Sequence, residues 1–191
     1  TFTVSTMRET AAAESRPYHH GDLSRALIDA ARRLLESEGP SALSLRAVAR
    51  EAGVSPAAPY HHFKDKGELL EAVAEEGWDM LNDSLSAARK SAHSVKDKLT
   101  ALGVAYVVFA RENPSLYRIM YDGSRNKEEL PSHVHLEDDS AYCQVRDTLV
   151  EAGADPADEI ALELATTAAW CAAHGLAEMA SFKQFDTLKA A

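Results

Sequence analysis

The sequence has no long uncharged run, which limits the kinds of protein it can be. Its longest stretches without Asp, Glu, Lys or Arg are residues 164–177, with 14 residues, and residues 99–110, with 12. A membrane-spanning helix needs roughly 17 to 25 apolar residues. Residues 1–15 also lack the apolar core of a secretory signal. We therefore expect no membrane span, and no secretory signal is visible.

Glycine and cysteine are sparse as well. The nine glycines are never closer than ten residues to one another, which excludes the glycine-rich loops that cradle phosphates and the Gly-x-Ser-x-Gly turn of many hydrolases. The two cysteines, Cys143 and Cys171, lie 28 residues apart in segments that look helical. Such a pair is no disulfide framework, so a reduced, cytoplasmic protein is expected.

Basic residues are fewer than acidic ones and unevenly distributed. The net charge of -10 argues by itself against a nucleic-acid partner, because neutralising phosphates takes clustered Lys and Arg. Residues 1–66, however, hold 9 Lys and Arg against 8 Asp and Glu, whereas residues 67–191 hold 11 against 22. This split indicates a small head that can approach a polyanion and an acidic body that stays away from it. The alternative is an ordinary acidic protein in which charged residues are unevenly distributed along the chain by chance.

Three short helices are predicted at the start of the chain, after an arm at residues 1–16. The first runs over residues 23–38 and ends before a Gly-Pro pair. The second starts behind the capping residue Ser44 and ends at a glycine. The third begins at a Ser-Pro pair and covers residues 55–63, about two turns.

Longer amphipathic segments follow, with no strand-like alternation between them. The periodic segments run from Lys66 to near His93 and then near residues 95–112, 114–122, 137–152 and 157–180. The sequence therefore predicts an all-α protein in two parts, a three-helix head at residues 17–66 and an antiparallel helical body at residues 67–191.

The second and third helices have the anatomy of a helix-turn-helix. A small residue at Ala49 lets the two helices cross closely, and Gly53 supplies the turn. In such a unit the second helix lies in the major groove of DNA, with its N-terminal residues near base edges and phosphates. Geometry alone leaves this function and an ordinary pair of core helices equally open.

Two runs of residues add a family resemblance. The sequence S-L-R-A-V-A-R-E-A-G-V-S at residues 44–55, followed by Y-x-x-F-x-x-K-x-x-L-L from Tyr60, resembles the DNA-binding head of the TetR family of bacterial transcriptional regulators. This resemblance covers about residues 20–73. The sequences N-P-S-L-Y-R-I-M from Asn113 and W-C-A-A-H-G-L from Trp170 resemble, more weakly, the W-x-x-x-H-G type of ligand-binding domain found in one branch of that family.

The resemblance implies a homodimeric regulator, most often a repressor, whose two heads occupy successive major grooves of a palindromic operator. A small-molecule effector bound in the body would change the spacing of the heads and release the DNA. Pro59 departs from the family pattern, because a proline removes a helical hydrogen bond and makes the start of the third helix irregular. By resemblance, the DNA-binding residues are Ser44, Arg46, Ser55, Pro56, Ala57, Ala58, Tyr60, His61, His62 and Lys66.

The body offers a candidate effector site. Trp170 and His174 are four residues apart and share a helical face. A ligand pocket beside an aromatic wall and an ordinary core histidine are both consistent with this spacing. The candidate effector-binding residues are Trp78, Tyr106, Phe109, Tyr117, Met120, Tyr121, Tyr142, Trp170 and His174.

Other interpretations remain at this point. His133, His135 and the acidic residues 137–139 are the best metal candidates, although a solvated surface loop is preferred. A metal sensor or a small-molecule carrier whose helix-turn-helix does not read DNA is therefore an alternative. No local signature pairs a nucleophile with a base, so we expect neither an enzyme nor a cofactor. A small-residue face fits a helix-helix dimer seam or an intramolecular contact; it comprises Ala161, Ala165, Ala168, Ala169, Ala172 and Ala173.

Overall fold

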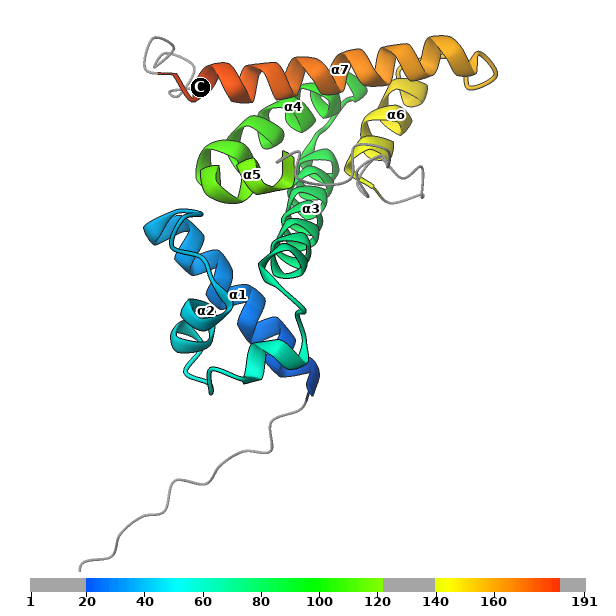
Figure 1. Cartoon of the computed structure of the whole chain (residues 1–191). Helices are drawn as coiled ribbons and strands as arrows, with labels where there is room; N and C mark the ends of the chain where they lie inside the picture. Colours follow the sequence, from blue (N-terminus) through cyan, green and yellow to red (C-terminus); the bar gives the residue numbers. More distant parts are fainter. Residues whose placement is uncertain (1–19, 122–139, 183–191) are drawn as a thin grey trace, which may run out of the picture.

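The computed structural model describes residues 20–121 and 140–182, and within these residues every regular element is helical (Figure 1). The arm at residues 1–16 and the candidate metal residues His133, His135 and 137–139 lie outside the described residues. The elements in chain order are α1 (His20–Glu38), α2 (Leu45–Glu51), η1 (Ala58–His61), α3 (Lys66–Ser91), α4 (Val95–Glu112), α5 (Pro114–Tyr121), α6 (Ala141–Glu151) and α7 (Glu159–Ala180). The predicted all-α class is confirmed.

The head consists of α1, α2 and η1 around the start of α3. Ser44 is the N-cap of α2, and its hydroxyl oxygen accepts a hydrogen bond from the backbone N–H of Ala47 at 3.1 Å. After α2 the chain turns at Gly53, whose φ of 69° lies in the left-handed region. Ala49 is buried where the helices cross. The predicted cap, turn and crossing residue of the helix-turn-helix are therefore all present.

The prediction of a two-turn third helix is wrong. Only the four residues of η1 are helical, and they form a 3₁₀ turn. Pro59 has no N–H to donate to the carbonyl of Ser55, so the first α-helical bond cannot form. The turn closes instead through shorter bonds, from Tyr60 N to the Ala57 carbonyl at 3.2 Å and from His62 N to the Pro59 carbonyl at 2.9 Å.

The body is organised around the 26-residue helix α3, which extends from the head to α6 and α7 (Figure 1). Asp65 caps its N-terminus by accepting a hydrogen bond from Glu68 N at 3.1 Å, and Glu68 in turn accepts one from Lys64 N. A single cluster of buried apolar residues continues from the head through α3 into α4 and α5. The head and the body are thus joined by a shared core.

Helix α7 lies across the far end of the body and is mostly exposed (Figure 1). Only four of its 22 residues are buried, and by length and composition it is apolar enough to cross a membrane. Glu163 and Glu178 limit its uncharged run to 14 residues, which is why the sequence count did not mark it. The small-residue face is divided, since Ala169 and Ala173 pack against the core while the other four alanines are exposed.

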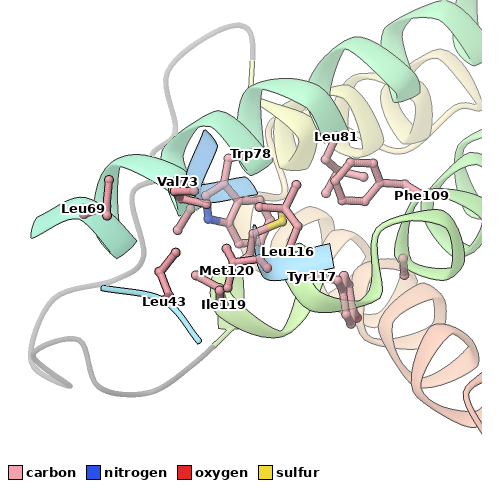
Figure 2. Packing of buried hydrophobic residues seen from close by; sticks show 14 of the residues in the cluster. Leu43, Leu69, Val73, Trp78, Leu81, Phe109, Leu116, Tyr117, Ile119 and Met120 are labelled. Atoms are coloured by element: carbon pink, nitrogen blue, oxygen red, sulfur yellow. The ribbon is translucent and has the colours of Figure 1, made fainter. Parts of the chain in front are cut away.

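Helix α5 packs unusually close to α3 at Gly77. A β-carbon built at Gly77 would lie 2.7 Å from Met120 Sδ and 3.1 Å from Leu116 Cδ1. Figure 2 shows Leu116, Ile119 and Met120 of α5 directed at α3, near Val73 and Trp78. Leu116 and Met120 are almost completely buried, so the missing side chain of Gly77 defines the depth to which α5 inserts.

The Gly77→Ala variant should therefore be less stable than the wild type. Overpacking a core typically costs about 1–3 kcal/mol, more than the roughly 1 kcal/mol that alanine gains over glycine within a helix. Urea unfolding at a fixed protein concentration measures the difference. Gly103→Ala on α4 is the matched control, because nothing lies within 4 Å of its β-carbon. It should be neutral or stabilising, and an equal loss in both variants would contradict the close approach.

Candidate DNA-binding surface and ligand site

The residues predicted to contact DNA all lie within or directly beside α2, the turn after it, η1 and the start of α3. Ser44 and Arg46 stand at the start of α2, and the remainder lie on the turn, on η1 and at the start of α3. Tyr60 is 54% exposed, whereas Pro59 and Phe63, close to it in the sequence, are buried. Eight of the ten are exposed, and Ala58 and His62 are half-buried.

Two of these side chains also have structural roles. The ammonium of Lys66 donates a hydrogen bond to the carbonyl of Pro40 at 3.0 Å, which ties the start of α3 to the loop after α1. An ammonium has three donors, so two remain for a phosphate. The Ser44 hydroxyl accepts the capping bond of α2 and keeps its own proton to donate. Both residues can therefore hold the head together and contact DNA.

The body brings three tyrosines and one histidine together from three helices. The hydroxyl of Tyr117 on α5 lies 2.6 Å from Nδ1 of His174 on α7, and the hydroxyl of Tyr106 on α4 lies 3.1 Å from the same nitrogen. The hydroxyls of Tyr106 and Tyr121 are 2.5 Å apart. We call these four residues the polar cluster. With Nδ1 unprotonated, a chain forms in which Tyr117 donates to His174 while Tyr106 and Tyr121 share a second bond.

Burial keeps the phenols of the polar cluster protonated. Desolvation raises the pKa of Tyr117 to about 12. It also raises the pKa of Tyr106 and Tyr121 well above the usual value; the neighbouring phenols raise the pKa of Tyr106 further, whereas the hydrogen bond with Tyr106 partly lowers that of Tyr121. The cluster therefore presents neutral hydroxyl groups at ordinary pH, each able to donate or accept a hydrogen bond.

Aromatic rings enclose the polar cluster. Trp78 meets Tyr121 at a ring-centroid distance of 5.1 Å, and Trp170 meets Tyr106 at 5.2 Å, both edge to face. Trp170 and His174 thus both approach Tyr106, as their four-residue spacing allows. The structure brings six of the nine candidate effector residues together at this point.

The other three candidates do not join the polar cluster itself, although the ring of Tyr142 meets Trp170 edge to face at a centroid distance of 5.8 Å. The hydroxyl of Tyr142 lies 2.8 Å from both Glu163 Oε1 and Thr167 Oγ1 of α7. Met120 packs against Gly77, and Phe109 lies in the core opposite Leu81 of α3 (Figure 2). These residues position α5, α4 and α6 around the polar cluster.

A small apolar cavity adjoins the cluster at Tyr106 and Trp170. Its volume is about 50 Å³. It is lined by Leu85, Leu99, Leu102, Gly103, Tyr106, Val145, Ala169, Trp170 and Ala173. Sequence reasoning missed Leu99, Leu102 and Gly103, although their spacing of seven, four and three residues before Tyr106 places all of them on its helical face.

The raised pKa values predict a loss of stability at high pH. A phenol whose pKa is higher in the folded chain than its unfolded value of about 10 stabilises the fold below that pH. This contribution is lost as the pH rises from about 10 towards the folded value of about 12 for Tyr117. Unfolding measurements in this range should show a shallower decline for Tyr117→Phe than for the wild type. Ionisation of every tyrosine near pH 10 in the intact fold would show that the cluster is open to water.

Comparison with known proteins agrees with both halves of this structure. Residues 27–73 match the family described as bacterial regulatory proteins, tetR family, and residues 99–191 match the tetracyclin repressor-like C-terminal domain. The HTH-type transcriptional regulator BetI of Rhizobium meliloti (strain 1021) is 34% identical over 109 residues, which is 56% of this chain and 54% of that protein. The chain spans about half the length of the curated relatives it matches.

Solved structures share the fold over most of the chain. A protein of unknown function from Rhodococcus sp. RHA1 has a TM-score of 0.67 and 35% identity, over 87% of each chain. A transcriptional regulator of the TetR/AcrR family from Thermobifida fusca YX-ER1 has a TM-score of 0.64 and 19% identity, over 88% of this chain and 93% of that one. Since the two family matches together cover most of the sequence, the chain belongs to the tetR family of bacterial regulatory proteins.

Proposed function

We propose that the protein is a cytoplasmic transcriptional regulator that binds a DNA operator and responds to a small molecule, acting as a repressor. The observation that carries this proposal is the head itself. A capped α2, a glycine turn and η1 form a helix-turn-helix-like unit, and Arg46, Tyr60 and Lys66 are exposed on it or directly after it. Arg46 suits bidentate bonds to phosphate or guanine, and Tyr60 can donate to phosphate.

The two functions divide between two domains, a DNA-binding head at residues 17–66 and a body from residue 67 onward. Helix α3 begins at the boundary, with Asp65 as its cap. The acidic body and the nearly neutral head support this division, because a polyanion repels the first and not the second. The ten head residues named above are the proposed DNA contacts.

The polar cluster and its aromatic wall form the proposed effector site. Its nine candidate residues divide into six that converge, Trp78, Tyr106, Tyr117, Tyr121, Trp170 and His174, and three that support them. Convergent polar groups on an apolar aromatic surface are typical of small-molecule sites. The roles of Trp170 and His174 on the same face of α7 also support assignment of the body to the W-x-x-x-H-G type.

We propose that the exposed face of α7 packs against a second copy of the chain in a homodimer. Ile160 and Leu164 are 76% and 67% exposed, and the exposed Ala161, Ala165 and Ala168 of the same helix leave room for another helix to approach. An open groove between α6 and α7 runs along Arg146, Ile160 and Leu164. Exposed apolar surface of this kind marks an interface.

The dimer is tested by placing a charge on this face. Leu164→Asp should convert the dimer to a monomer at micromolar concentration, because a carboxylate would have to be desolvated in the interface. Sedimentation velocity measures the change. Val104→Asp on α4 is the matched control, since Val104 is 50% exposed on another helix. A wild-type chain that sediments as a monomer would contradict the proposal.

DNA binding is tested by selection from a duplex library at near-physiological salt. We expect a palindrome with half-sites about one helical turn apart. Arg46→Ala and Lys66→Ala should then weaken binding to all sequences and lower the salt slope by about one each, whereas substitutions at Ala57 or His61 should change base preference. Lys90→Ala, which removes an exposed charge from the body, is the control and should have no effect. Failure to enrich any sequence, with and without cell extract as a source of effector, would favour the small-molecule carrier.

A further inference from the structure

Helix α5 lies between the DNA-binding head and the polar cluster and contacts both. Tyr117 and Tyr121 on one side reach His174 and Tyr106. On the other side Leu116 and Met120 are buried against α3, and in Figure 2 Tyr117 points away from them. An element of only eight residues is therefore in contact with the proposed effector site through one face and with the remainder of the core through the other.

The N-terminus of α5 is capped by the head. The backbone N–H of Leu116 donates a hydrogen bond to Oε1 of Glu36, in the last turns of α1, at 3.2 Å. The side-chain amide of the preceding Asn113 donates to the carbonyl of Phe109 in α4 at 3.0 Å, and Pro114 has no N–H. A carboxylate from another helix thus occupies the place of a local cap, where the helix dipole favours negative charge.

The packing at Gly77 restricts how α5 can be displaced against α3. Met120 fills the space that a side chain at Gly77 would occupy, so α5 has no room to tilt further into α3. Protein interiors are close-packed and pass such displacements on rather than absorb them. A shift of Tyr117 that follows loss of its bond to His174 would therefore reach Leu116, the preceding residue, and its bond to Glu36.

We propose that Glu36 is a positioning residue that couples the polar cluster to the DNA-binding head through its hydrogen bond to Leu116. This inference rests on the proposed function for its biological meaning. It names the contact through which binding of an effector would change the conformation of α1. The bond is intact when Tyr117 is held by His174. Loss or rearrangement of that bond weakens the cap and loosens the last turns of α1.

A second connection between head and body exists and has to be separated from this one. Arg25 and Arg32 of α1 both lie 3.3 Å from Oε1 of Glu76 on α3. These ion pairs join α1 to α3 without contacting the polar cluster. An effect that is transmitted to α1 through α3 should therefore not change when Glu36 is substituted.

Hydrogen exchange measured by mass spectrometry on the full chain distinguishes the two connections. His174→Ala alone should raise exchange in α5 and in the last turns of α1, each by about fivefold or more. In a Glu36→Ala background the same substitution should still raise exchange in α5, while its effect on α1 falls to less than about twofold. An effect on α1 that is the same with and without Glu36 would overturn the proposal.

Two further variants control this experiment. Glu38→Ala removes the same charge from the end of the same helix and should leave the coupling intact; a loss of coupling equal to that of Glu36→Ala would assign it to charge alone and overturn the proposal. Glu36→Gln retains an acceptor oxygen and should preserve the coupling, which guards against partial unfolding in the alanine variant. The comparison of hydrogen exchange in the single and double variants needs neither DNA nor effector. It therefore tests the role of Glu36 even if the selection from the duplex library yields no operator. With an operator in hand, the change in affinity caused by His174→Ala should likewise disappear in the Glu36→Ala background.

Discussion

The close approach of α5 to α3 at Gly77 is the contact on which the arrangement of the body depends. Because a β-carbon is missing there, Met120 and Leu116 insert deeply into α3. That insertion turns Tyr117 and Tyr121 towards α4 and α7 and brings the start of α5 to Glu36. One steric feature therefore places both the polar groups of the proposed effector site and the cap from the head.

The polar cluster is costly to bury unless every member is paired. Three phenols and an imidazole lie within hydrogen-bonding distance of one another, which satisfies groups that would otherwise oppose folding. A ligand that enters must replace these bonds with its own donors and acceptors. Selectivity then follows from the same energetics, because a ligand that leaves a hydroxyl unpaired is rejected. The apolar cavity beside Tyr106 adds no such requirement and imposes only a limit on shape.

Much of the fold could be predicted from the sequence, since it depends on local signals. Capping residues and hydrophobic periods placed α2, α4, α5 and α7 within one or two residues. The length of η1 was not predicted, because periodicity does not register the hydrogen bond that Pro59 removes. The start of α6 also lies later than predicted, at Ala141, since Ser140 supplies its cap.

Spacing along one helix predicted which site residues lie together on that helix, whereas Trp78 of α3 and Tyr106 of α4 meet the rest only through the packing of the helices. Trp170 with His174, and Tyr117 with Tyr121, are four residues apart, and the structure brings both pairs to the polar cluster. Tyr142 has the same residue type and helical context, yet Glu163 and Thr167 hold its hydroxyl away from that cluster. Glu36 contacts a residue 80 positions later in the chain, a pairing for which no local signal exists.

The exposure of α7 could not be predicted from the sequence either. Its period shows an apolar face, but only the packing of the other helices shows how much of that face stays exposed. In the proposed dimer, association through the exposed apolar residues Ile160 and Leu164 of α7 leaves the two nearly neutral heads as the parts of the molecule that DNA does not repel.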